Sequence, residues 1–273
     1  MAWFTDRHFF LLAVALYGLS ALHSVFLWRR GFRRDDHVNF FLLLAGFALH
    51  TTAMFKRGFS LNACPVNNLY EATMFLLWAL ALACLAVGLL PRLKFLGAFA
   101  SPVLFAVGVF ALMPSLDPAH GPKPDFSNWL TSLHAATILL AYGAFGLGAV
   151  AAVMFLTQQH NLKFHKLRAV LSLLPSIQRL EIVTFRLVLA GFGLFSIGLE
   201  AGSHLSHPVN EPYWTDSKVR WSIFMWLAYL ALLASRKFFR QSNRRFTIGV
   251  ITAFAFLLLT FWITNLNSPL HHQ

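Results

Sequence analysis

Charged side chains are scarce in this sequence. Only 12% of the 273 residues are charged, and 10 of these are acidic against 22 Lys and Arg. Soluble domains carry about a quarter charged residues, so this composition argues against a soluble protein. The hydrophobic fraction of 58% also excludes intrinsic disorder. The composition is that of a chain that lies in a lipid bilayer.

Cysteine is nearly absent as well. The two copies, Cys64 and Cys84, lie far apart, and the sequence contains neither a CxxC pair nor a CxxCH motif. The first absence excludes a thiol–disulfide relay of the CxxC type, and the second excludes that the chain is itself a c-type cytochrome. We interpret Cys64, near the outer end of the third predicted helix, as a bystander.

The apolar residues form long runs that predict membrane helices. A helix of about 20 apolar residues spans a bilayer. The sequence contains eight such runs, and they cover residues 9–28, 38–55, 69–90, 95–113, 130–157, 183–203, 221–235 and 246–265. No large soluble domain is left over. The sequence therefore predicts an all-α polytopic membrane protein with eight transmembrane helices, in a single domain of residues 1–273.

The basic residues are distributed unevenly between the predicted loops. The loops 29–37, 91–94, 158–182 and 236–245 hold 15 Lys and Arg, whereas the segments on the other side hold six. Loops rich in Lys and Arg stay in the cytoplasm, so both the N-terminus and the C-terminus are predicted to lie outside. The net charge of +12 is then mostly a topology signal. We expect attraction to anionic lipid of the inner leaflet, and no binding of nucleic acid, because the basic residues are scattered over short loops.

Two segments combine polar and aromatic residues at the mouths of predicted helices. One is residues 68–78, which contains Tyr70, Glu71 and Trp78, and the other is residues 213–221. Polar groups at such positions are costly to keep there and usually mark a site. For Glu71, a place in the first turn of a helix is a sufficient alternative explanation, because the helix dipole favours a carboxylate there.

Two of the 12 histidines are candidate haem ligands. His134 lies near the outer end of the fifth predicted helix, and His271 follows the eighth. The predicted topology puts both on the outer face, together with Trp214 and Asp216. Two imidazoles opposed across an aromatic pocket are what a bis-histidine haem requires.

The residues around the second segment would complete such a pocket. Trp214 and Trp221 could stack on the porphyrin, and Lys218 or Arg220 could pair with its propionates. The alternatives are simpler: His134 at a helix mouth is an interface residue, and the tryptophans belong to an ordinary interfacial belt.

His50 is a third histidine of interest, because it lies inside the second predicted helix among apolar neighbours. An intramembrane ionisable residue is a functional hypothesis by default. A neutral histidine that is hydrogen-bonded between helices is the alternative interpretation.

Over nearly its whole length, the chain resembles the cytochrome c assembly family of membrane proteins, the CcsA (ResC) group and its HemX-like relatives. Residues 65–78 resemble the family's "P-x-x-NLYES…F…W" helix entry, and His134 followed by Ala141-Tyr142-Gly143 resembles its "H…SYA" element. Residues 214–221, with Trp226, Tyr229 and Arg236, resemble the tryptophan-rich "WWD" signature. Leu270-His271 resembles the C-terminal "LHS".

This resemblance implies a specific function in the bacterial inner (cytoplasmic) membrane. The chain would handle and present haem on the outer face for c-type cytochrome biogenesis, as at most one subunit of a haem-attaching complex. It implies that His134 and His271 ligate the iron of a transiently bound haem b. The platform would be shaped by Trp214, Asp216, Lys218 and Trp221. A partner of the CcsB (ResB) type and an apocytochrome c would complete the assembly.

The sequence departs from the family's pattern in the tryptophan-rich loop. Thr215 stands where a tryptophan is expected, or beside its deletion, while Ser217 replaces a proline and Arg220 a glutamate. The family's intramembrane histidine before Arg236 is also missing, so the resemblance does not carry over an intramembrane haem-entry site. Two alternatives follow: a HemX-like scaffold or regulator that binds no haem, and a transporter with a proton relay through His50.

Overall fold

The structure is a computed structural model, and it describes residues 5–30, 37–61, 68–89, 96–117, 129–164, 176–205, 216–238 and 243–267. Every regular element in these ranges is helical, which confirms the all-α prediction. The helices are α1 (Asp6–Arg30), α2 (His37–Leu61), α3 (Leu69–Gly88), α4 (Leu96–Ala111), α5 (Trp129–Phe164), α7 (Ile177–Ser203), α8 (Ser217–Phe238) and α9 (Asn243–Asn267), with a short 3-10 helix at Pro114–Leu116.

Most of these helices are long and apolar enough to cross a bilayer. Within the described residues, six qualify by length and composition: α1, α2, α3, α5, α7 and α9. The helix α4 is apolar but has only 16 residues. The helix α8 corresponds to the predicted span 221–235, and it carries Lys218, Arg220, Arg236 and Lys237 toward its two ends. The chain is thus a polytopic helical membrane protein, while the number of eight spans stays a prediction.

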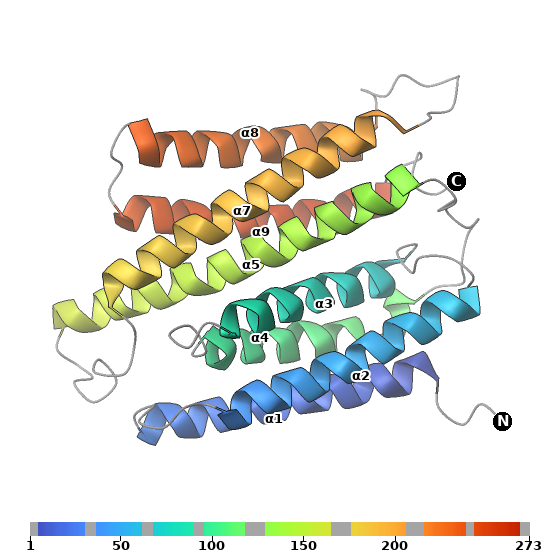
Figure 1. Ribbon diagram of the computed structural model, residues 1–273, viewed down its shortest axis with the longest axis horizontal. Helices are drawn as coiled ribbons and strands as arrows, with labels where there is room; N and C mark the ends of the chain where they lie inside the picture. The colour runs from blue at the N-terminus through green and yellow to red at the C-terminus, as the bar shows by residue number, and fades with distance from the viewer. Residues whose placement is uncertain are drawn as a thin grey trace.

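The helices form two groups that meet along α3 and α5. Figure 1 shows α1 to α4 on one side and α5, α7, α8 and α9 on the other. The beginning of α1 and the end of α9 lie at the same end of the bundle, together with the beginnings of α3, α5 and α8 (Figure 1). We call this the terminal end of the bundle. Residues that are far apart in the sequence therefore meet there.

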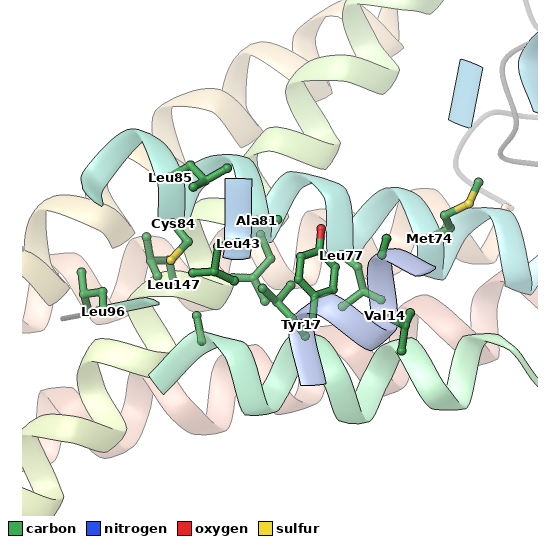
Figure 2. Close-up of a cluster of buried hydrophobic side chains, with 14 of the residues drawn as sticks. Val14, Tyr17, Leu43, Met74, Leu77, Ala81, Cys84, Leu85, Leu96 and Leu147 are labelled. Carbon is green, nitrogen blue, oxygen red and sulfur yellow. The ribbon is translucent and has the colours of Figure 1, made fainter. Parts of the chain in front are cut away.

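Each group has its own apolar core. The first lies mainly among α1 to α4 and includes Tyr17, Leu43, Leu77 and Leu96 (Figure 2). The second lies among α5, α7, α8 and α9, where the rings of Phe145 and Tyr229 stack with their centroids 3.8 Å apart.

Glycines allow the helices to approach closely where the groups meet. A Cβ atom added at Gly143 of α5 would lie 2.5 Å from the carbonyl oxygen of Ala79 of α3. Small residues permit such backbone contact between membrane helices, where close packing takes the place of the hydrophobic effect. The same rule holds on α7, where a Cβ atom at Gly191 would meet the ring of Phe145 at 2.7 Å.

At the opposite end of the bundle, polar groups bind three helices to one another. Arg236 of α8 forms an ion pair with Glu181 of α7. Asn243, the first residue of α9, accepts a hydrogen bond from Arg236 at 2.5 Å and donates one to Glu181. Each member of this triad is half-buried and bonds both of the others, so the three helices are held together where the apolar core ends.

Gly143→Ala should destabilise the protein by about 1–3 kcal/mol, because the added methyl group must push two backbones apart. The thermal unfolding midpoint of the purified protein in mild detergent measures this. Gly193→Ala is the matched control, because a Cβ atom at Gly193 would meet nothing within 4 Å. Equal midpoints for the two variants would contradict the tight contact between α3 and α5.

Candidate functional site at the terminal end of the bundle

His134 lies in the second turn of α5 and faces α7. Its Nδ1 lies 2.7 Å from the carbonyl oxygen of Gly198. A Cβ atom at Gly202, one turn further along α7, would lie 2.6 Å from the same Nδ1. The imidazole therefore fits into a gap that exists only because α7 has glycine at that position.

This contact determines the tautomer of the ring. A carbonyl oxygen can only accept, so Nδ1 must carry the proton and donate it to Gly198. The lone pair then belongs to Nε2, and within the described residues His134 makes no further hydrogen bond. A histidine whose Nδ1–H is held by a backbone carbonyl is the usual form of a metal-ligating histidine, because the bond orients the ring and raises its basicity.

The first turn of α8 lies near this histidine. Asp216, which is 2% exposed, caps the helix, since its Oδ1 accepts hydrogen bonds from the backbone of Lys218 at 2.6 Å and of Val219 at 3.3 Å. The Lys218 ammonium is close enough to the His134 ring to interact with it electrostatically. The structure therefore places Lys218, next to its helix cap Asp216, near His134, whereas the role of these residues in binding haem stays a prediction.

The N-cap role of Asp216 is a structural one that sequence reasoning missed. An aspartate before a helix supplies the acceptor that the first free backbone N–H groups require. The cap explains the buried carboxylate without a cofactor, and it also determines where Lys218 and the start of α8 lie.

The tryptophans of α8 have different surroundings. Trp221 is 37% exposed, and its ring meets those of Phe224 and Phe256 edge-on, with centroid distances of 5.6 Å each. Trp226 donates from Nε1 to Ser196 Oγ at 2.9 Å and thereby connects α8 to α7. Trp226 is a packing residue, whereas Trp221 lies at the surface between α8 and α9.

Two of the expected site residues, Trp214 and His271, lie outside the described residues, as does Cys64. The described part of α9 ends at Asn267, at the same end of the bundle as the beginning of α5 (Figure 1). Within the described residues, no three His, Cys, Asp or Glu side chains gather as a metal ion would require.

The other polar segment, residues 68–78, is bound into the α1–α4 group by an ion cluster. The Arg57 guanidinium of α2 contacts three carboxylates: Glu71 at 2.8 Å, Asp6 at 3.2 Å and Asp117 at 2.5 Å. We call these four residues the Arg57 cluster. It joins α1, α2, α3 and the turn after α4, and Glu71 is fully buried in it. A buried carboxylate requires such a partner. The helix dipole is therefore at most part of the reason why the Glu71 carboxylate is stable in its buried position.

The neighbours of Glu71 in the segment are equally engaged. Asn68 caps α3 by accepting from the Glu71 backbone at 2.8 Å, and its amide donates to Asp117 at 2.8 Å. The ring of Tyr70 lies beneath the guanidinium groups of Arg7 and Arg57, at 5.4 and 5.3 Å. Residues 68–78, which the sequence analysis predicts to mark a site, thus help to hold the helices of the α1–α4 group together at the terminal end of the bundle.

Comparison with known proteins finds a matching family model and several related proteins. Residues 66–272 match the family model described as "Cytochrome C assembly protein". The chain is 28% identical to "Cytochrome c biogenesis protein CcsA" of Guillardia theta over 63% of this chain and 64% of that protein. It is 26% identical to the protein of the same name from Prochlorococcus marinus (strain MIT 9303), over 84% and 81%. It is 25% identical to "Protein HemX" of Brevibacillus brevis, over 93% and 94%. The first match thus spans less than two thirds of the relative.

Arg57→Ala should destabilise the protein by about 3–5 kcal/mol, because three carboxylates would lose the guanidinium that they share, although Asp117 would keep its ion pair with Arg7 at 3.8 Å. Thermal unfolding in detergent checks this. Arg57→Lys should restore only part of the stability, since an ammonium cannot offer the planar fork that bonds three partners. Arg244→Ala, at an exposed position, is the control, and a loss no larger than in this control would refute the role of the cluster.

Proposed function

Because the chain belongs to the cytochrome c assembly protein family, we propose that its role in cytochrome c biogenesis is to hold and present haem on the outer face of the membrane. The observation that carries this proposal is the hydrogen bond from His134 Nδ1 to Gly198. It leaves the Nε2 lone pair for an iron atom and orients the ring before any ligand arrives.

In this proposal, His134 and His271 are the two axial ligands of a haem b that binds transiently. Trp214 and Trp221 border the porphyrin, and Lys218 pairs with a propionate. Asp216 acts indirectly, because as the N-cap of α8 it places Lys218 beside His134. Haem supplies a redox-active iron and vinyl groups that can react with thiols, and the protein supplies ligation, orientation and shielding from water.

The topology that we propose for this function has eight spans with both termini outside. The distribution of Lys and Arg supports it. The arrangement of the helices agrees, because the beginning of α1 and the end of α9 lie at the same end as the beginning of α5, the helix of His134 (Figure 1). In a bacterial inner membrane, that end would face the compartment in which apocytochrome c receives its haem.

The proposed partners follow from the family. An apocytochrome c would receive the haem, and a membrane protein of the CcsB (ResB) type would complete the complex. The inner face would contact anionic lipid through its basic loops.

A second candidate function is a HemX-like membrane scaffold or regulator that binds no haem. One observation favours it: the similarity to Protein HemX covers nearly all of both chains. The N-cap role of Asp216 is also compatible with a scaffold. The two functions differ in whether the purified protein carries haem.

Absorption spectra of the protein, purified in mild detergent from haem-replete cells together with its partner, distinguish these functions. We expect a haem Soret band that weakens or shifts in both His134→Ala and His271→Ala, because each removes one axial ligand. His160→Ala, at the opposite end of α5, is the control. A colourless wild-type protein would refute the ligand assignment and leave the scaffold.

Gly202→Ala tests the gap on α7 that holds the His134 ring, without changing the proposed ligand itself. The added Cβ would lie 2.6 Å from Nδ1, so the ring must move and its bond to Gly198 must lengthen or break. We expect a shifted Soret band and weaker haem retention, whereas Gly193→Ala on the same helix should leave both unchanged. Identical spectra for the two variants would show that the gap on α7 has no part in haem binding.

A further inference from the structure

Among the described residues, three fully buried polar atoms on α2 and α3 make no hydrogen bond. They are Nε2 of His50, the hydroxyl of Tyr70 and the hydroxyl of Thr73. All three side chains are 0% exposed. Buried polar atoms without a protein partner are normally hydrogen-bonded to internal water, because leaving them unpaired costs about 1–3 kcal/mol each.

The three side chains belong to the same region, where α1, α2 and α3 pack against one another. The ring of Phe10 on α1 contacts both the His50 ring, at a centroid distance of 4.9 Å, and the Tyr70 ring, at 5.8 Å. His50 also approaches the backbone of Met74. Tyr70, Thr73 and Met74 are three and four residues apart on α3, so they share the face that meets His50.

Polar groups continue from His50 toward the terminal end of the bundle. Tyr70 is the link, because its ring lies beneath Arg57, and Arg57 bonds Asp6 near the beginning of α1. The Arg57 side chain is 11% exposed and that of Asp6 is 16% exposed. Water therefore reaches the outer end of this row of polar groups.

Polar groups also continue in the other direction. His50 Nδ1 lies 3.2 Å from the hydroxyl of Tyr17, whose ring crosses between the helices where Gly46 leaves room, since a Cβ atom there would meet the ring at 2.7 Å. Figure 2 shows Tyr17 surrounded by the apolar side chains of the core. One turn further along α1, Ser20 donates to Asn39.

The row of polar groups ends near the end of α1 that lies opposite the terminal end of the bundle. Ser24 bonds the backbone of Ser20 at 2.7 Å, and its hydroxyl lies 3.3 Å from that of Ser101 on α4. Ser24 follows Asp6 by 18 positions along α1, which corresponds to a rise of about 27 Å at 1.5 Å per residue. This is close to the ~30 Å thickness of the hydrocarbon core.

We propose that these residues form a hydrated proton path through the α1–α4 group, with His50 as its central proton-exchanging residue. Polar side chains inside a membrane bundle are costly, and they mark ion and proton pathways. Packing between α1 and α2 would be served better by apolar side chains at these positions. Most of the path lies on α1 and α2, outside residues 66–272 that match the family, so it is separate from the haem site proposed above.

The proton balance of the path is simple. A proton from one aqueous side binds the ring nitrogen of His50 that carries the lone pair, and the proton on the other nitrogen leaves toward the opposite side. One N–H bond forms and one breaks, and no electron is transferred. The first tautomer is restored when the ring rotates, or when internal water carries the newly bound proton from one ring nitrogen to the other. Tyr17 and Tyr70 relay the proton through their hydroxyl groups on the two sides of the ring.

Proton entry into liposomes tests this proposal. The purified full chain is reconstituted with the pH dye pyranine inside, and a potassium diffusion potential drives protons inward. We expect faster acidification than in protein-free liposomes, and roughly a tenfold or greater loss in His50→Gln, because glutamine keeps hydrogen bonds but has no ring nitrogen that can take up and release a proton. His160→Gln, at the exposed end of α5, should behave as the wild type.

Two results would overturn the path: a wild-type rate equal to that of protein-free liposomes, or an unchanged rate in His50→Gln. If His50→Gln does not give a monodisperse protein, Tyr17→Phe decides instead, because it retains the ring and removes only the hydroxyl. A rate in Tyr17→Phe equal to that of the wild type would then refute the proposal. None of these readouts depends on bound haem, so the outcome is independent of the proposed function.

Discussion

The Arg57 cluster is the interaction on which the arrangement of the α1–α4 group depends. One guanidinium faces three carboxylates from three separate parts of the chain: the start of α1, the start of α3 and the turn after α4. In an apolar chain, each carboxylate would be very costly to bury alone, and together they would repel one another. The planar fork of arginine satisfies all three at once. The helix mouths must therefore meet around α2, and the register of α1 and α3 along it follows.

A second constraint is the exclusion of side-chain volume between helices. Gly143 places α3 against α5, and Gly198 and Gly202 place α7 against the beginning of α5. Membrane helices gain little from the hydrophobic effect on association, so the fit of small residues largely determines which helices touch. The same glycines that bring α7 close to α5 also form the seat of His134. Helix packing and the chemistry of the candidate ligand thus rest on one feature, the absence of side chains on one face of α7.

The polar residues of the chain separate into groups with different tasks. Asn68 and Asp216 cap helices, Trp78 and Trp226 hydrogen-bond from the core to Thr51 and Ser196, and Glu71 belongs to an ion cluster. Sequence reasoning can name both a site and a structural role for such residues, as it does for Glu71, because a polar group is costly in the membrane whatever the reason for keeping it. Only the hydrogen-bond or ion-pair partner of each polar group shows whether it caps a helix, holds helices together or is available as a ligand. His134 is the residue whose partner, a backbone carbonyl, is what a ligand would need.

The sequence by itself determined the helical class, the positions of most helices and the membrane setting, because these depend on the length and composition of apolar runs. It also determined that His134, Asp216 and Lys218 share one end, since alternation of the helices puts every second mouth on the same side. The sequence analysis did not single out Gly198 and Gly202, because nothing in one sequence says which side chain faces a glycine on a neighbouring helix. Only the tertiary structure decided the tautomer of His134, the partners of Arg57 and the row of polar groups around His50. Each of these depends on the rotation and depth at which one helix meets another, which are set by the fit of side chains from distant parts of the chain.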